Sequence, residues 1–63
     1  MKISLKAARV NAGLKQEDVA EQLGIHVQTY QRIERNSDMA TVEQAKKISA
    51  IVGVSYDDIF FGQ

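Results

Sequence analysis

A glycine within an otherwise helical stretch constrains this chain more than any other feature. The sequence AEQLGIHVQTYQRIE, residues 20–34, has apolar residues at helical spacing on both sides of Gly24-Ile25, and it has no proline. Ala20 is small enough to let two backbones approach, Gly24 tolerates a positive φ, and Ile25 can fill the space between two helices. These residues predict two short helices that meet at a corner, rather than one helix with a defect.

The other apolar segments end in the same way. Glycine is the usual left-handed residue after a helix, and asparagine is the next most tolerant. Five such residues follow segments with helical spacing: Gly13, Gly24, Asn36, Gly53 and Gly62. They predict an all-α fold of five helices, with no strand of useful length. The expected helices span residues 4–12, 16–23, 27–35, 42–52 and 56–61.

Start signals support the last two helices. The segment from Thr41 to Gln44 has the form of a capping box, and the segment from Ser55 to Asp58 is a looser version. Apolar residues at helical spacing are expected to form one core. They are Leu5, Ala8, Ala12, Leu14, Val19, Ala20, Leu23, Tyr30, Ile33, Val42, Ala45, Ile48, Val52, Ile59 and Phe60.

The composition predicts one small domain over residues 1–63. There is no cysteine and only one histidine, so disulfides and thiolate metal sites are excluded and a metal centre is not expected. No segment is apolar enough for a membrane span or a signal peptide, so we expect a cytoplasmic protein without membrane contact. We see no acid–base constellation and no glycine-rich phosphate loop. An enzyme, a cofactor and a small-molecule ligand are therefore not expected.

The net charge is zero, which by itself argues against a nucleic-acid partner. The charge is unevenly distributed, however. Residues 1–36 contain six Lys/Arg and four Asp/Glu, whereas residues 37–63 contain two and four. The N-terminal half is therefore positive, and this weakens the objection.

Much of the chain resembles a known family. The resemblance begins with QEDVAEQLGI at 16–25, followed by Tyr30, Ile33, Glu34 and Arg35, and continues at Thr41, Gly53-Val54-Ser55 and Ile59-Phe60. This combined pattern is similar to the helix-turn-helix domain of the lambdoid phage repressor and Cro family (XRE type), with the motif at about 16–35. The resemblance implies an all-α domain that binds double-stranded DNA as a homodimer. Its third helix would enter the major groove of a near-palindromic site.

The segment 27–35 carries the candidate DNA-reading residues. At about 100° per residue, Tyr30 and Ile33 face the core, and polar side chains occupy the opposite side. Glutamine can bond adenine, arginine can bond guanine, and a valine methyl can contact thymine. With the resemblance, the expected base-reading residues are Val27, Gln28, Gln31 and Arg32, with Gln28 and Arg32 foremost. The alternative is a polar face that is merely solvated.

Phosphate contacts are expected on both sides of this segment. The start of the second helix offers backbone amides and a side-chain amide, and the residues after the third helix could hold the other side. The expected backbone-contacting residues are Lys15, Gln16, Thr29, Arg35, Asn36, Ser37 and Thr41. The sequence departs from the family at 36–40, which contains Asp38 and no basic residue. A shallow salt dependence is therefore expected.

Two further features concern positioning. The resemblance implies a partly buried ion pair between Arg9 and Glu34 that fixes the angle of the third helix, and the alternative is two unrelated surface charges. His26 and Lys15 occupy N-cap positions, for which neither is well suited. His26 could contact a phosphate or respond to pH, or it is simply an exposed imidazole.

Aromatic residues gather at the end of the chain. Tyr56, Phe60 and Phe61 offer more apolar surface than a short last helix can bury. We expect one of them to complete the core and another, Phe61 or Tyr56, to form a patch between two copies, where the dimers of the family also meet. All three are candidates for the dimer interface. The alternative is that all three pack within one monomer.

Two functions remain open from the sequence. The first is a sequence-specific DNA-binding regulator, most simply a repressor domain. The second is a protein-interaction module, such as an antitoxin or an anti-repressor target, which the zero net charge and Asp38 favour slightly.

Overall fold

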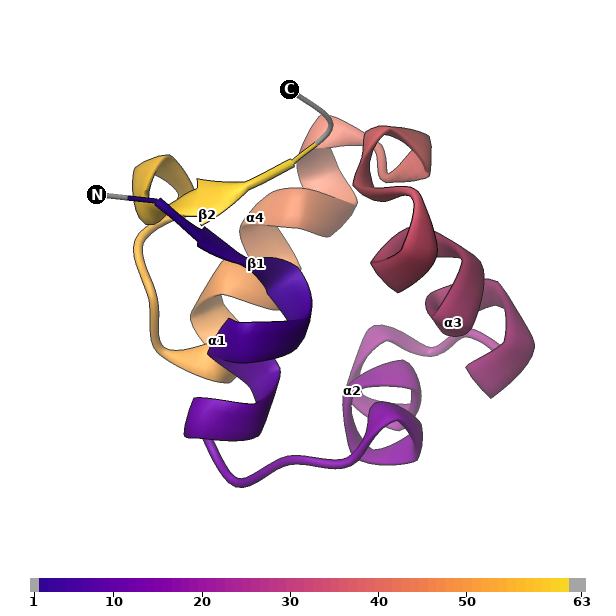
Figure 1. Cartoon of the computed structure of the whole chain (residues 1–63). Coiled ribbons are helices and arrows are strands. Elements are labelled where there is room, and N and C mark those ends of the chain that lie inside the picture. The colour runs from indigo at the N-terminus through magenta and orange to yellow at the C-terminus, as the bar shows by residue number, and fades with distance from the viewer. Residues whose placement is uncertain (1, 62–63) are drawn as a thin grey trace.

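The computed structural model describes residues 2–61, and within them four α-helices are accompanied by short 3₁₀ and β segments (Figure 1). In chain order the elements are β1 (Ile3–Ser4), α1 (Leu5–Asn11), α2 (Gln16–Leu23), α3 (Val27–Arg35), η1 (Ser37–Met39), α4 (Val42–Val52), η2 (Tyr56–Asp58) and β2 (Ile59–Phe60). The bounds expected for the second, third and fourth helices match α2, α3 and α4. None of the helices in residues 2–61 combines the length and the apolar character needed to cross a bilayer.

Gly24 makes the corner between α2 and α3. Its φ is +74°, in the left-handed region. The Ile25 amide donates to the Ala20 carbonyl at 3.0 Å and the Gly24 amide donates to the Glu21 carbonyl at 3.1 Å, which is the Schellman pattern. Ala20 is buried and Ile25 packs against the core, so the predicted roles of both residues at this corner are confirmed.

The prediction of a last helix over residues 56–61 is wrong. Residues 56–61 form the 3₁₀ turn η2 and then β2, which pairs in parallel with β1. Ile3 is opposite Ile59, and the two strands lie side by side in Figure 1. A six-residue helix is too short to be stable by itself, and β1 offers backbone partners from the other end of the chain. Local spacing gives no sign of such a long-range pairing, so the expectation of no strand is also corrected.

Asn36 is not a left-handed helix stop. Its φ is −143°, and the chain continues from α3 into η1 rather than reversing. The Met39 amide donates to the Asn36 carbonyl at 3.0 Å, so this segment keeps turning in the right-handed sense. Gly13 and Gly53 have the predicted positive φ, whereas Gly62 lies outside the described residues.

The core lies where the four helices and β2 meet. Its fully buried side chains include Leu5, Ile48 and Ile59. Three predicted core residues are corrected because the structure exposes them: Ala12, Val42 and Phe60. Ala12 lies just beyond α1, and Val42 is in the first turn of α4, before that helix reaches the core. Phe60 follows the buried Ile59 in a strand, so its side chain points to the opposite face.

Candidate nucleic-acid interface

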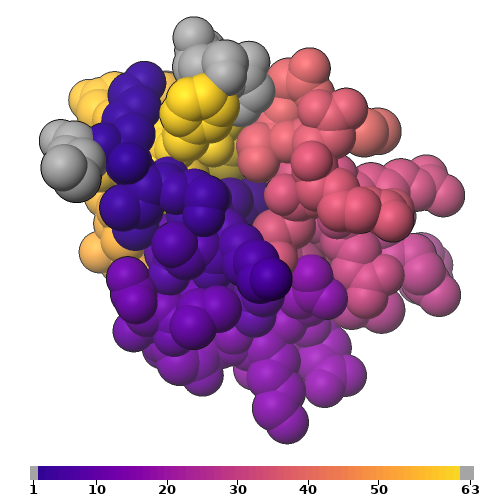
Figure 2. Space-filling model, viewed as in Figure 1, coloured from indigo at the N-terminus to yellow at the C-terminus, as the bar shows by residue number. Residues whose placement is uncertain are grey.

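The helix α3 has one buried side and one exposed side. Tyr30 and Ile33 are 0% and 3% exposed and anchor the helix to the core. The side chains of Gln28, Thr29, Arg32 and Arg35 are exposed, and those of Val27 and Gln31 are partly buried. We call these six residues the outer face of α3. In Figure 2 the segment coloured magenta to pink projects from one edge of the molecule.

The candidate phosphate-contacting residues outside this face come from the start of α2, the segment after α3 and the start of α4. Lys15 is exposed and Gln16 is partly buried at the start of α2, and Asn36 and Ser37 follow α3. The hydroxyl of Thr41 accepts a hydrogen bond from the Gln44 amide at 3.0 Å, which completes the predicted capping box of α4. Thr41 therefore has a structural role in the free protein.

An ion pair joins α1 to α3. Arg9 Nε lies 2.7 Å from Glu34 Oε2, Arg9 Nη2 lies 3.1 Å from Glu34 Oε1, and the two side chains are only 11% and 5% exposed. Arg9 also donates to the Leu14 carbonyl at 2.9 Å, just beyond the end of α1. The guanidinium therefore connects three parts of the chain with a bidentate geometry that lysine cannot provide.

The charges of this pair shape its acid–base properties. Burial by itself would raise the pKa of Glu34, but the hydrogen bonds from Arg9 and Gln16 outweigh it and lower this pKa. The hydrogen bond with Glu34 raises the pKa of Arg9. Both side chains are therefore charged at neutral pH. Burial raises the pKa of Tyr30, and its hydroxyl has no hydrogen-bond partner among residues 2–61.

Gln16 connects this pair to the outer face of α3. Its Nε2 donates to Glu34 Oε1 at 3.1 Å, and its Oε1 accepts from Gln31 Nε2 at 3.2 Å. Sequence reasoning placed Gln16 against a phosphate and Gln31 against a base, but it missed the contact between them. The two residues lie 15 positions apart on different helices, so no spacing rule links them.

The starts of α2 and α3 differ in their capping. At Lys15 the backbone amide donates to the Asp18 carboxylate at 2.8 Å, while the lysine side chain, which has no acceptor atom, caps nothing. At His26 there is no side-chain capping hydrogen bond. The expectation that both are poor N-cap side chains is confirmed.

Comparison with known proteins identifies the family of this arrangement. A family model described as helix-turn-helix matches residues 5–59, which is most of the chain. The chain belongs to this helix-turn-helix family. A curated relative, an uncharacterized HTH-type transcriptional regulator of Methanocaldococcus jannaschii, is 40% identical over 60 residues, which cover 95% of this chain and 91% of the relative. No solved structure gives a significant match. The family resemblance seen in the sequence is confirmed.

The aromatic residues at the end of this helix-turn-helix domain face different ways. Tyr56 and Phe61 stack with ring centroids 5.7 Å apart, and Phe61 packs against the core. Tyr56 is 38% exposed and Phe60 is 42% exposed. Phe60 therefore offers an apolar surface on the side of β2 that faces away from Ile59.

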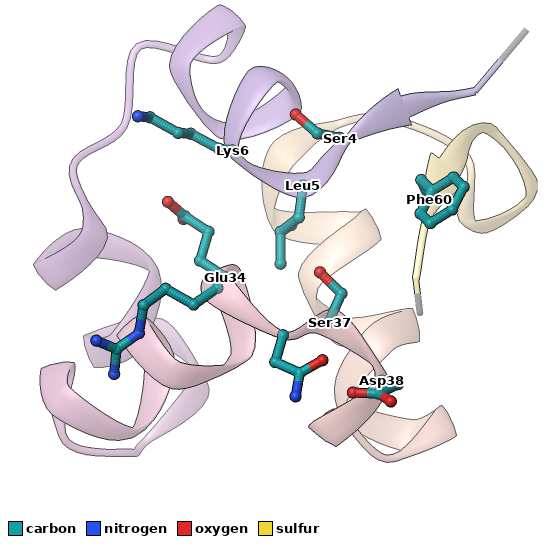
Figure 3. Close-up of a pocket in the computed structure, with 9 residues that line it drawn as sticks. Ser4, Leu5, Lys6, Glu34, Ser37, Asp38 and Phe60 are labelled. Carbon is teal, nitrogen blue, oxygen red and sulfur yellow. The ribbon is translucent and has the colours of Figure 1, made fainter. Parts of the chain in front are cut away.

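A groove of about 390 Å³ lies at the far end of α3 from Val27 (Figure 3). The groove is lined by two cationic residues, Lys6 and Arg35, and by two anionic residues, Glu34 and Asp38. The ring of Phe60 borders it as well. Gln28 and Arg32 do not line this groove, but Arg35 of the outer face and the candidate phosphate-contacting residues Asn36 and Ser37 do, so the groove borders the C-terminal end of the outer face.

Proposed function

We propose that this protein is a sequence-specific, double-stranded DNA-binding transcription regulator, most simply a repressor. It binds a near-palindromic operator as a homodimer, with α3 in the major groove of each half-site. The observation that carries this proposal is the outer face of α3. Polar and cationic side chains are exposed on one side of this helix, and Tyr30 and Ile33 are buried in the core on its opposite side.

The base-reading residues are Val27, Gln28, Gln31 and Arg32. Gln28 and Arg32 are exposed and long enough to reach base edges, where glutamine suits adenine and arginine suits guanine. Val27 contacts a thymine methyl from the start of the helix. Each good bidentate contact is worth about 1–3 kcal/mol of discrimination.

Backbone contacts position the domain without reading sequence. The start of α2 presents Lys15 and Gln16 to a phosphate, and Gln16 retains one amide hydrogen after its bond to Glu34. The remaining contacts come from Thr29, Arg35, Asn36, Ser37 and Thr41. Asp38 is exposed beside Ser37, so few counterions are released and the affinity falls only gently with salt.

The homodimer forms through the aromatic end of the chain. Tyr56 and Phe60 are the exposed aromatic rings there, and Phe61 supports Tyr56 from beneath. Sedimentation of the wild type and of Phe60→Ser, with and without operator DNA, tests this interface. A wild type that sediments as a monomer without DNA and binds the operator as a single copy, on one half-site, would contradict this interface.

Enrichment from a random double-stranded DNA pool, at about 50 and about 150 mM salt, tests the function itself. We expect a near-palindrome with half-sites about one helical turn apart. Gln28→Ala and Arg32→Ala should each abolish or strongly weaken binding to that site. Gln22→Ala, at an exposed position of α2 that is not among the proposed DNA-contacting residues, is the matched control and should bind like the wild type.

A protein partner is the alternative. The zero net charge, Asp38 and the exposed apolar side chains of Met39 and Val42, 55% and 61% exposed, favour it. A partner that binds the Gln28→Ala and Arg32→Ala variants normally, with no DNA enriched by the wild type, would decide for this alternative.

A further inference from the structure

A continuous chain of hydrogen bonds leads from the buried ion pair to the outer face of α3. Glu34 Oε1 accepts from Gln16 Nε2 at 3.1 Å, and Gln16 Oε1 accepts from Gln31 Nε2 at 3.2 Å. The side chain of Glu34, where these hydrogen bonds begin, is almost fully buried. Gln31, where they end, is only partly buried, on the same helix as the exposed Gln28 and Arg32. These hydrogen bonds therefore connect the protein interior to the surface proposed to face DNA.

The ionised carboxylate sets the direction of every bond in this chain. Glu34 is held charged by Arg9, and an ionised carboxylate can only accept. Gln16 must therefore turn its NH₂ group toward Glu34, which leaves its oxygen directed at Gln31. Gln31 must in turn present its NH₂ group to Gln16. Reversing either amide would place two oxygens or two NH₂ groups against each other.

The result is that the side-chain oxygen of Gln31 has no hydrogen-bond partner among the described residues 2–61. In the major groove, hydrogen-bond donors belong to adenine N6 and cytosine N4, whereas guanine and thymine present only acceptors there. A glutamine that was free to rotate could satisfy either kind of base by turning its amide over. Gln31 lacks this freedom while Gln16 holds it.

We propose that Gln31 reads DNA through its oxygen and selects adenine or cytosine at one position of the contacted strand. Gln16 and Glu34 are positioning residues that impose this polarity. Adenine ranks first, because its N7 lies beside N6 and can accept the remaining amide hydrogen of Gln31. This inference rests on the proposed function and adds to it the base class read by one residue and the origin of that preference.

The substitution Gln16→Lys should invert the preference. An ammonium group can donate to Glu34 as Gln16 does, but it has no acceptor to offer Gln31. The amide of Gln31 then turns its oxygen inward and its NH₂ group outward, which suits guanine or thymine. Gln22→Lys adds the same charge at an exposed position of the same helix and is the matched control. Gln31→Met removes both polar atoms while keeping the length of the side chain.

The experiment is enrichment from a random double-stranded DNA pool with the wild type and these three variants. The position that loses its preference in Gln31→Met is the one read by Gln31. At that operator position, the wild type and Gln22→Lys should favour adenine or cytosine over guanine or thymine by roughly three- to tenfold, the value of about one hydrogen bond. Gln16→Lys should favour guanine or thymine. Thermal unfolding followed by circular dichroism confirms that each variant is folded.

The outcomes separate the two proposals. An enriched wild-type site with the same base preference in Gln16→Lys, or with no position altered in Gln31→Met, overturns this inference and leaves the proposed function standing. Failure of the wild type to enrich any site overturns both.

A second measurement needs no DNA. The side-chain amide resonances of Gln31 in the free protein should move toward random-coil positions in Gln16→Met and stay unchanged in Gln22→Met. Equal resonances in the wild type and Gln16→Met would overturn the hydrogen-bond chain itself.

Discussion

Arg9 and Glu34 meet through two hydrogen bonds, of 2.7 and 3.1 Å, that connect α1 to α3. Glu34 lies on α3, one residue after the buried Ile33, so its position also sets the rotation of the outer face. Gln16 reaches the same carboxylate from α2. Three helices are thereby fixed relative to one another by one buried charge pair.

Breaking this pair should cost more than removing it. We expect Arg9→Met and Glu34→Met each to lower the free energy of unfolding by about 3 kcal/mol or more, because each leaves a buried charge without its partner. The double variant should lose less than the sum of the two single losses. Urea unfolding of all four proteins measures the coupling. Additive losses would show that the two charges act independently.

Acid should weaken the fold through Glu34. Its pKa is lowered in the folded protein from the ordinary 4.5, so the unfolded chain takes up the proton first as the pH falls. The stabilisation is present above the unfolded pKa and is lost as the pH falls through the folded pKa. Urea unfolding between about pH 7 and 3 should show this loss, and Glu34→Gln should flatten that part of the profile. An unchanged profile in Glu34→Gln would contradict the assignment.

The hydroxyl of Tyr30 should be dispensable for stability. It is buried and has no hydrogen-bond partner among the described residues. Tyr30→Phe should therefore change the free energy of unfolding by between zero and a gain of about 1 kcal/mol. Tyr30→Leu, which leaves a cavity, should lose about 2 kcal/mol or more. A clear loss in Tyr30→Phe would reveal a hydrogen bond to Glu34 or Arg9 in solution.

Gly24 should be needed for its backbone conformation and not for space. Its φ is +74°, and a Cβ at this position would meet no atom within 4 Å in the described part of the chain, apart from its own chain neighbours. Gly24→Ala should therefore cost about 1 kcal/mol, the penalty of a left-handed alanine. Gly24→Asn should cost less, because asparagine tolerates this conformation better. Thermal and urea unfolding compare the variants, and equal losses would point to a steric cause instead.

The start of α3 can be improved. His26 is an exposed N-cap residue without a capping hydrogen bond, so His26→Ser should raise the free energy of unfolding by about 0.5–1 kcal/mol.

Ser4 caps α1 by accepting from the Ala7 amide at 3.0 Å, and Ser4→Ala should lower the free energy of unfolding by a similar amount. Urea unfolding checks both changes. No gain in His26→Ser would mean that the imidazole itself stabilises the helix start.

The sequence alone was sufficient to predict the helix-turn-helix. Gly24 requires a left-handed conformation, Ala20 and Ile25 meet the needs of the corner, and the apolar spacing gave the bounds of α2, α3 and α4. These are local requirements of backbone and helical periodicity, so they can be read from neighbouring residues.

Only the tertiary structure decided the features that join distant residues. The pairing of Ile3 with Ile59 turned the last predicted helix into a strand. The contact of Gln16 with Gln31 determined which atom of Gln31 is left for a partner. Hydrogen bonds between residues far apart in the chain depend on where the helices come to lie, and no local pattern encodes that position.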